Sequence, residues 1–289
     1  MSKIMVQKEA VNTSPKVQSI DRALAILETL ADYPSLSLME LSEKVHLHKA
    51  TTHRLVNSLM ENGYIDRNPD TKQYRISLKM FHLGNKRVHN IDFLNVAKSM
   101  IRQLSDDTRQ TVHLVVEDND EVLYIDKYGE SRGVRMQSKI GTKAPLYCTA
   151  VGKALLSTRQ NAAVREYWDS IVPEQKTGRT ITTYEDLISE LDEIRRNGYA
   201  LDDEEFEEGI VCIAAAFSSA REVAAGAISI SLPLSDMVDK EFYTGKILES
   251  YDYLGAHINN GTTIFRTFAP AASRITVFGD FNHWQEWDM

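Results

Sequence analysis

Residues 37–63, SLMELSEKVHLHKATTHRLVNSLMENG, hold two short helical patterns separated by a tight connection. Ser37 and Glu40 have the spacing of a capping box, which predicts a helix over residues 38–45. A connection of four residues leads into a second helix, which is expected to end at 62–63 because an Asn-Gly pair favours a left-handed stop. Two short helices joined by so tight a turn predict a helix-turn-helix.

The flanking sequence extends this motif into a winged helix. Upstream, apolar residues recur three or four positions apart over residues 20–30, which is the stripe of an amphipathic helix. Downstream, alternating runs on either side of the turn at 68–71 predict a β-hairpin. Residues 18–77 are therefore predicted to form a winged helix-turn-helix domain, preceded by a flexible arm over residues 1–17.

The second helix of the pair has a polar face that favours contact with DNA. Its apolar positions are expected to pack on the other helices, which leaves donors and acceptors at its N-terminal end for a major groove. Basic residues on the hairpin have the charge to contact phosphates. The alternative is a polar face that is merely solvated, and the capping box, tight turn and basic wing together argue against it. The predicted DNA-binding residues are Lys49, Thr51, Thr52, His53, Arg54, Asn57, Arg67, Lys72 and Arg75.

The charge distribution separates two parts of the 289-residue chain. Residues 1–90 carry a net charge of +4 and the remainder −12, so the overall −8 combines a mildly basic module with an acidic one. The longest wholly apolar run, residues 210–217, is far shorter than the roughly 20 residues of a membrane helix. The two cysteines are too few for a disulfide framework or a cysteine-based zinc cluster. We therefore expect a cytoplasmic protein with no membrane contact, no metal and no cofactor.

The second module begins after a predicted linker helix over residues 78–90. A helical stripe follows, and from Thr111 the apolar period changes to two, which predicts a strand, a turn and a returning strand. Alternating strands and helices indicate an α+β effector-binding domain over residues 91–236, with a largely antiparallel sheet. The further strands are expected at 133–138, 209–217 and 224–232, and the helices at 149–156, 161–171 and 184–197.

Several patterns in this module suggest an enzyme, and each fails on its spacing. The run Val151-Gly152-Lys153-Ala154 lacks the upstream glycine and the following Ser or Thr of a phosphate-binding loop. The six carboxylates of residues 202–208 are interpreted as a solvated acidic segment rather than as a catalytic pair. Cys148 and Cys212 have neither a histidine close in sequence nor the spacing of metal ligands. No catalytic residue is therefore predicted, and the protein is not expected to be an enzyme.

Three motifs in the first module, QSIDRALAIL (18–27), HKATTHRL (48–55) and ENGYI (61–65), resemble the DNA-binding domain of the IclR family of bacterial transcription regulators. The second module resembles the effector domain of the same family over residues 141–155, 198–205, 209–215 and 227–231. Thr52 departs from the pattern where an apolar residue is common, and Ala216 stands where many relatives have proline. The resemblance implies a homodimer or dimer of dimers that binds a roughly palindromic operator in double-stranded DNA.

The resemblance also implies a pocket for a small organic acid in the second module. The predicted helix at Thr149 would offer backbone N–H groups to an anion, and Asp202 would accept hydrogen bonds from ligand hydroxyls. The alternative for Met136, Ile210 and Cys212 is that they are only core residues. Because the recognition helix and residues 78–94 are most similar to regulators of pectin and ketodeoxygluconate catabolism, a repressor of sugar-acid catabolism responding to 2-keto-3-deoxygluconate is expected. The implied effector-binding residues are Met136, Ala150, Val151, Asp202, Ile210, Cys212, Ser229 and Ser231.

The C-terminal segment does not follow the family pattern. No amphipathic stripe is visible after residue 234, where relatives have a long helix. Instead, residues 237–289 resemble the opening of the N-terminal β-sandwich module of glycogen-branching enzymes, with Phe268 where that family generally has Trp. A truncated, β-rich extension is therefore predicted. Two interpretations stay open, a relic of a gene fusion and a glycan-responsive regulator or binding protein that uses Trp284 and Trp287.

Overall fold

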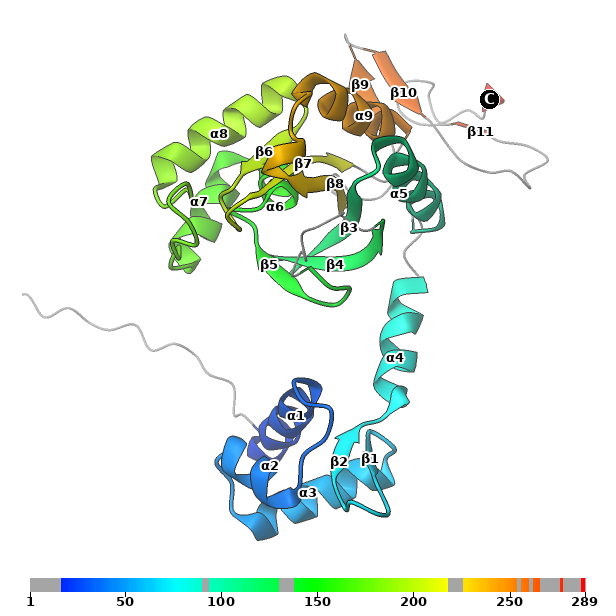
Figure 1. Ribbon diagram of the computed structural model, residues 1–289, viewed down its shortest axis with the longest axis vertical. Helices are drawn as coiled ribbons and strands as arrows, with labels where there is room; N and C mark the ends of the chain where they lie inside the picture. The colour runs from blue at the N-terminus through cyan, green and yellow to red at the C-terminus, as the bar shows by residue number, and fades with distance from the viewer. Residues whose placement is uncertain are drawn as a thin grey trace, which may run out of the picture. The chain divides into compact units, whose positions relative to one another are not determined.

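The computed structural model describes residues 17–89, 94–129, 138–217, 226–253, 256–259, 262–265, 276–277 and 287–288 (Figure 1). The chain divides into two compact units, Met1–Ile91 and Asp92–Met289. Residues 1–16 of the predicted arm lie outside the described residues. In the part of the chain that is described, no helix is long and apolar enough to cross a membrane.

The first unit has the predicted winged helix-turn-helix architecture. The Ser37 hydroxyl accepts a hydrogen bond from the Glu40 N–H at 3.3 Å, and the Glu40 carboxylate accepts one from the Ser37 N–H at 2.8 Å, so the capping box is confirmed. The Asn68 side chain accepts hydrogen bonds from two backbone N–H groups and so closes the wing turn. The elements are α1 (Gln18–Ala31), α2 (Leu38–Lys44), α3 (Lys49–Glu61), β1 (Ile65–Arg67), β2 (Tyr74–Ile76) and α4 (Leu78–His89).

One hydrophobic core holds the winged helix together. Leu30 of α1, Leu41 of α2 and Val56 of α3 are almost fully buried, and Ile65 and Tyr74 of the hairpin join them. Burying one face of α3 against α1, α2 and the hairpin leaves its opposite face exposed to solvent. The core therefore fixes which side chains of α3 are available to a partner.

The second unit is built on a six-stranded antiparallel sheet, which confirms the predicted fold class. The strand order is β5-β4-β3-β8-β7-β6. The strands β7 and β8, which are the last of these six in the sequence, therefore lie between β3 and β6. Sequence reasoning missed the two edge strands, β5 and β6, which have only three and four residues. The strands are β3 (Thr111–Asp118), β4 (Glu121–Tyr128), β5 (Lys143–Pro145), β6 (Ala200–Asp203), β7 (Ile210–Phe217) and β8 (Gly226–Pro233).

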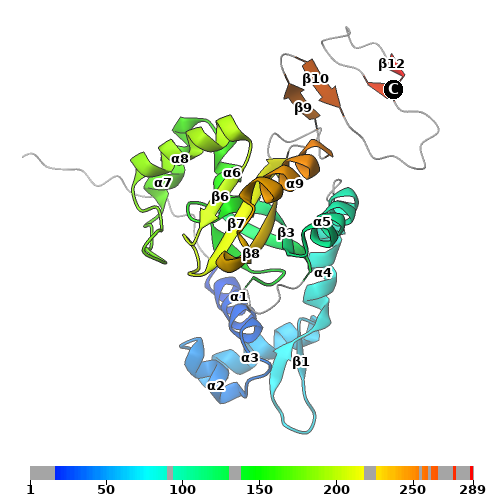
Figure 2. The ribbon, with the colours of Figure 1, turned by 45° about the horizontal axis from the view of Figure 1, so that its top comes forward.

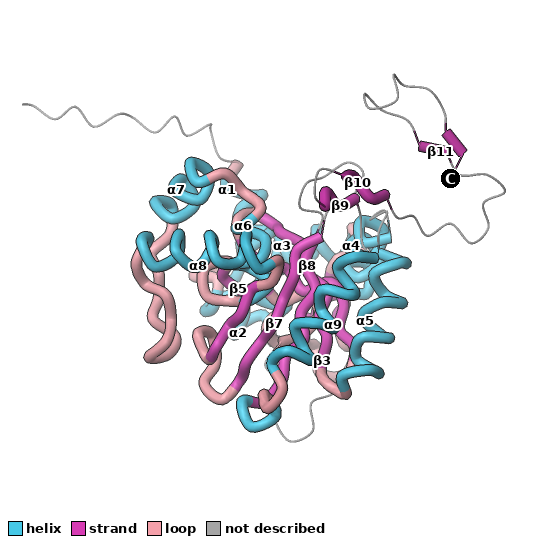
Figure 3. The backbone as a smooth tube through the Cα atoms, turned by 90° about the horizontal axis from the view of Figure 1, so that it is seen from above, coloured by secondary structure: helices cyan, strands magenta, loops and turns pink. Residues whose placement is uncertain are grey.

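Helices cover both faces of this sheet (Figure 3). On one face, α5 (Leu94–Thr108) and α9 (Lys240–Tyr253) lie side by side against β3, β7 and β8. On the other face, α6 (Ala150–Ser157) packs on the sheet and contacts α8 (Tyr184–Asn197), which also contacts α7 (Asn161–Ser170). Gly198 ends α8 with a φ of +80°, a conformation that favours glycine, and so turns the chain into β6.

The region after β8 corrects one sequence expectation. A short 3₁₀ helix (Leu234–Asp236) and α9 follow the strand, although no helical stripe is visible in the sequence. Among the residues of α9 whose burial is described, only Tyr243 and Ile247 are buried, and they lie one turn apart. Two apolar positions are too few to give a recognisable helical stripe in the sequence. Four short strands come next, β9 (Ala256–Asn259), β10 (Thr262–Phe265), β11 (Thr276–Val277) and β12 (Trp287–Asp288), of which β9 and β10 form a hairpin (Figure 2).

Candidate functional site: a DNA-binding face and a sheet cavity

One side of α3 carries the predicted DNA-contacting side chains. Lys49, His53 and Arg54 are exposed, and Thr51 and Asn57 are half-buried. We refer to these five residues as the recognition face. They lie within the first nine residues of α3. Their side chains include guanidinium, amide and hydroxyl groups, which are groups that can read base edges.

Thr52 is a correction to the predicted set. Its side chain is fully buried, and its hydroxyl donates to the His48 backbone carbonyl at 3.3 Å, within its own helix. It lies four residues before Val56, on the side of α3 that faces the domain core. Thr52 therefore packs inside the winged helix and cannot present its hydroxyl to DNA.

The hairpin supplies three exposed basic residues, Arg67, Lys72 and Arg75. Arg67 lies over the Tyr74 ring at 5.3 Å and donates to the Lys72 backbone carbonyl at 3.4 Å, which orients its guanidinium along the wing. Arg75 is 4.0 Å from the Asp66 carboxylate across the two strands. Because all three side chains are exposed, they are accessible to phosphate groups.

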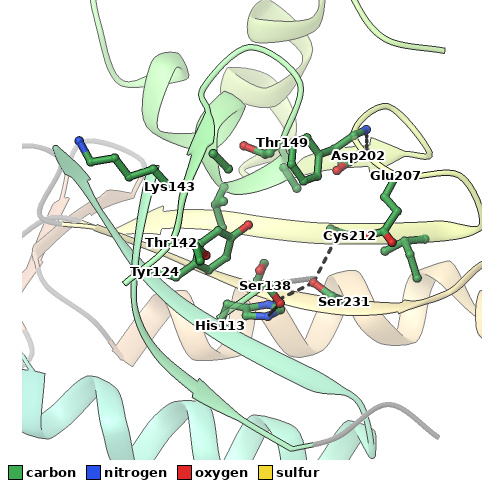
Figure 4. Close-up of a pocket in the computed structure, with 16 residues that line it drawn as sticks. His113, Tyr124, Ser138, Thr142, Lys143, Thr149, Asp202, Glu207, Cys212 and Ser231 are labelled. Carbon is green, nitrogen blue, oxygen red and sulfur yellow. Dashed lines mark hydrogen bonds between the residues drawn. The ribbon is translucent and has the colours of Figure 1, made fainter. Parts of the chain in front are cut away.

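The second unit contains a cavity of about 230 Å³ between the sheet and the N-terminus of α6 (Figure 4). Seven of the eight effector-binding residues predicted from the sequence line it, and the eighth, Met136, lies outside the described residues, as does most of the predicted strand 133–138. We call this space the effector cavity. Its walls are His113, Tyr124, Ser138, Thr142, Lys143, Ala144, Thr149, Ala150, Val151, Asp202, Phe206, Glu207, Ile210, Cys212, Ser229 and Ser231.

Sheet register explains why residues far apart in sequence meet in the effector cavity. His113 of β3 is paired with Ser229 of β8, and Cys212 of β7 is paired with both Ser231 and Asp202. Directly opposed residues of antiparallel strands point to the same face of a sheet. The three pairs therefore form a polar row across β3, β8, β7 and β6, on the face that α6 covers.

A chain of hydrogen bonds runs through this row. The Cys212 thiol donates to the Ser231 hydroxyl at 3.1 Å, Ser231 Oγ is 3.2 Å from His113 Nδ1, and His113 Nε2 is 2.8 Å from Ser138 Oγ (Figure 4). Burial, with a smaller contribution from the charge of Lys127, lowers the pKa of His113 to about 3. The imidazole is therefore neutral at physiological pH, with one donor and one acceptor nitrogen.

The first turn of α6 forms the opposite wall of the effector cavity. Thr149 caps the helix, because its hydroxyl accepts from the Gly152 N–H at 3.2 Å and donates to the Pro145 carbonyl at 2.8 Å. Gly152 is required for this packing, since a Cβ there would lie 2.4 Å from the backbone of Leu146. The Ala150 and Val151 N–H groups belong to the helix start, where no intrahelical acceptor is available. This wall thus offers backbone donors and the positive end of a helix dipole.

The acidic segment 202–208, which begins in β6, is partly buried, which corrects its interpretation as solvated. Asp202 and Glu205 are 4% and 7% exposed. Asp202 Oδ1 accepts from the N–H groups of Glu205 at 2.8 Å and Phe206 at 3.3 Å, so the carboxylate shapes the turn that follows the strand. Burial, and next the charge of Glu205, raises the pKa of Asp202 to about 7. Sequence alone gave no sign of this burial, because six carboxylates in seven residues are typical of a surface.

Behind the first turn of α6, a fully buried lysine binds two of the acidic side chains. The Lys153 ammonium donates to Glu190 of α8 at 2.9 Å and to Glu205. The other Glu205 oxygen, Oε2, is buried with no hydrogen-bond partner among the described residues. Lys153 therefore connects α6, α8 and the acidic turn in one ion-pair network.

The chemistry of the site supports binding rather than catalysis. Burial raises the pKa of the Cys148 thiol to about 12 and that of the Cys212 thiol further, so neither is a thiolate at physiological pH. Among the described residues, no group of three or more His, Cys, Asp or Glu side chains is placed to hold a metal ion. The sequence analysis did not predict His113 and Tyr124 as cavity residues. The alternation of their strands places them on the cavity side, but no motif in the sequence marks them as ligand-binding.

Family comparisons agree with both units. Residues 19–69 match the model of the IclR helix-turn-helix domain, and residues 85–252 match that of the bacterial transcriptional regulator IclR C-terminal domain. The second match includes most of α9, so this helix belongs to the family domain. A third match, to carbohydrate-binding module 48 (isoamylase N-terminal domain), covers residues 253–289 and begins later than the predicted boundary at residue 237.

Individual relatives give the same assignment. The HTH-type transcriptional regulator KdgR of Escherichia coli K12 is 36% identical over 217 residues, covering 75% of this chain and 82% of KdgR. XynR of the same organism is 34% identical over 228 residues, covering 78% of this chain and 90% of XynR. The crystal structure of Thermotoga maritima IclR superposes with a TM-score of 0.70 at 28% identity, covering 82% of this chain and 97% of that one. The chain therefore belongs to the IclR family and is a DNA-binding transcriptional regulator, not an enzyme.

Proposed function

We propose that this regulator is a repressor of a carbohydrate or sugar-acid catabolic operon and that a small organic acid in the effector cavity controls it. One observation carries the proposal: hydroxyl groups, a buried carboxyl group and a helix N-terminus converge on a single small cavity. The first effector to test is 2-keto-3-deoxygluconate, because the sequence is similar to regulators of ketodeoxygluconate catabolism and is 36% identical to KdgR.

Size and chemistry of the cavity favour a small, hydroxylated acid. Its volume of about 230 Å³ is below the roughly 300–1,000 Å³ of pockets for drug-sized ligands, so it suits a metabolite. The first turn of α6 and the Thr149 cap suit a carboxylate. Ser229, Ser231 and Tyr124 across the cavity suit the hydroxyls of the same molecule.

The first unit is proposed to bind a roughly palindromic operator as part of a homodimer or dimer of dimers. In this proposal the recognition face enters the major groove, and Arg67, Lys72 and Arg75 contact phosphates. Two apolar surfaces support association of copies: Ile20 and Leu24 of α1 are 55% and 50% exposed, and Leu78 and Phe81 of α4 are 83% and 70% exposed. Two-fold pairing would repeat the recognition face at two half-sites.

Effector binding is tested by isothermal titration of the full chain with 2-keto-3-deoxygluconate, gluconate and glucose. We expect the acids to bind and the neutral sugar not to bind. Ser229→Ala is expected to weaken acid binding about tenfold, because a cavity hydroxyl is lost, and Ser235→Ala, at an exposed serine after β8, is the matched control. Equal binding of glucose, or no effect of Ser229→Ala, would contradict the proposed orientation.

Repression is tested with an operator selected from random double-stranded DNA by the full chain. The selected sequence is expected to contain an inverted repeat. Placed over a promoter, it should lower reporter expression when the regulator is present, and the acid should restore expression. Activation of the reporter would show that the assignment as a repressor is wrong.

A further inference from the structure

Asp202 lines the effector cavity, and one of its two carboxyl oxygens is held by the backbone. Both hydrogen bonds that the structure gives this side chain, from the Glu205 and Phe206 N–H groups, go to Oδ1. No described residue donates a hydrogen bond to Oδ2. Figure 4 shows the carboxyl group beside Thr149 and the first turn of α6, on the wall of the cavity.

The charge of Lys153 partly offsets the raised pKa of Asp202, but the structure gives no hydrogen bond between the two side chains among the described residues. Lys153 of α6 is the nearby ammonium, and its hydrogen bonds go to Glu190 of α8 and Glu205 of the acidic turn. Glu207 of the same turn adds a further carboxylate to the cavity wall. The charge of Asp202 in turn contributes to raising the pKa of three neutral groups around it, Tyr124 of β4, Cys148 before α6 and Cys212 of β7.

An acid effector would therefore enter a site in which carboxylates outnumber cations. Lys153, behind the wall, is already shared by two carboxylates, and Lys143, the lysine of the wall, pairs with Asp118 at 2.8 Å and Glu121 at 3.1 Å. A second anion beside an ionised, buried Asp202 would repel it in a region of low dielectric constant. A proton on Asp202 removes this repulsion and creates a donor.

We propose that Asp202 binds the effector as a neutral carboxylic acid, donating a hydrogen bond from Oδ2, so that an acid effector is bound while Asp202 carries a proton. This inference rests on the proposed effector class and adds its coupling to pH. The proton comes from solvent when the apo side chain is ionised, and the effector carboxylate stays ionised. The pKa of about 7, raised chiefly by burial, places the coupling in the physiological range.

The inference predicts a pH dependence of effector affinity with a defined size. With an apo pKa of about 7, raising the pH from 6 to 8 should weaken binding of the acid by about tenfold. Titration calorimetry of the full chain with 2-keto-3-deoxygluconate, in two buffers of different ionisation enthalpy, should give close to one proton taken up at pH 8. Uptake should be close to zero at pH 6.

Two variants separate the donor role from a structural role. Asp202→Asn keeps a neutral donor of the same shape, so it should bind the acid with no pH dependence between pH 6 and 8. Asp202→Ala should bind weakly at both pH values. Tighter binding at pH 8 than at pH 6, or a tenfold pH dependence that persists in Asp202→Asn, would overturn the proposal.

The protonation of Asp202 can be measured without effector, so it can be tested independently of the proposed effector class. The carboxyl carbon of Asp202, assigned in ¹³C NMR spectra by its loss in Asp202→Asn, should titrate near pH 7 in the apo chain. Titration near pH 4 would overturn the proposal whatever the effector is. If no sugar acid binds even at pH 6, the proposed effector class is wrong, and titration near pH 7 would still support a neutral Asp202.

Discussion

The recognition face and the effector cavity differ in how their residues are brought together. The recognition face comes from nine consecutive residues of one helix, 49–57, and its functional side chains are exposed or half-buried. The effector cavity takes its polar residues from all six strands of the sheet, from the segments between them and from the N-cap of α6, and His113, Asp202, Ser229 and Ser231 are buried. In the first region, substitutions should change binding and leave the fold intact. In the second region, binding and stability depend on the same side chains.

The largest difference between the two regions is expected at Lys153. Lys153→Met leaves Glu190 and Glu205 without their cation, and removing one partner of a buried ion pair costs about 3–5 kcal/mol of unfolding free energy. Urea denaturation of the full chain, followed by a signal from the second unit, measures this loss. By contrast, Arg54→Ala, at an exposed position of the recognition face, should change the unfolding free energy by less than about 0.5 kcal/mol.

A matched variant tests whether charge is the cause. The triple variant Lys153→Met, Glu190→Gln and Glu205→Gln removes the uncompensated carboxylates and should regain most of the lost stability. If the triple variant is as unstable as Lys153→Met, the loss comes from packing of α6 and not from the ion pairs.

This contrast also explains what the sequence was able to predict. The winged helix follows from local signals, namely the Ser37–Glu40 capping box, the apolar period of α1 and the Asn68 turn, so its elements were predicted correctly. The sheet order places β8 between β3 and β7. No local pattern specifies the pairing of β3 with β8, since it depends on contacts between residues more than a hundred positions apart.

Burial was the property that the sequence did not reveal. Thr52 looks like part of a polar face, but it falls on the core side of α3, and Asp202 and Glu205 look solvated in an acidic run but are buried by α6 and the sheet. The effector residues came from the family resemblance rather than from a chemical pattern. His113 and Tyr124 were missed because a histidine or tyrosine in an alternating strand is equally typical of a surface.

The second prediction concerns DNA affinity. Arg54→Ala should weaken operator binding by about 1–3 kcal/mol for each half-site, because a side chain that can contact a base edge in a bidentate manner is removed. Fluorescence anisotropy with the selected operator measures it. Arg196→Ala, at an exposed arginine in the last turn of α8, is the matched control and should bind as the wild type does. Unchanged affinity of Arg54→Ala would remove this residue from the recognition face.

The third prediction is the acid sensitivity of the second unit. The folded pKa of His113 is about 3, below the ordinary 6.5, so below pH 6.5 the unfolded chain binds a proton that the folded chain does not. Stability from this group is complete above pH 6.5 and is lost towards pH 3, by about 2 kcal/mol at pH 5. His113→Gln should show a smaller loss of unfolding free energy between pH 7.5 and pH 5.

The comparison of regions supplies the control for this measurement. Asn57→Gln, which changes a side chain of the recognition face, should lose as much stability on acidification as the wild type does. An undiminished pH dependence in His113→Gln would show that the imidazole is not held neutral by burial and that its hydrogen bonds to Ser231 and Ser138 form in a charged state.

The smallest effect is expected at Thr52, and it decides where the recognition face ends. Thr52→Val keeps the volume of a side chain that is fully buried and removes only the hydrogen bond to the His48 carbonyl, so stability should fall by about 1 kcal/mol or less. Operator affinity should stay within about twofold of the wild type. Thr51→Val, at the half-buried neighbour, should weaken binding more than Thr52→Val, because Thr51 is only half-buried whereas Thr52 is fully buried. If both variants remain folded and Thr52→Val reduces affinity as much as Thr51→Val does, α3 must rotate within its domain when the protein binds DNA. The boundary between core and recognition face drawn from the free protein would then be wrong.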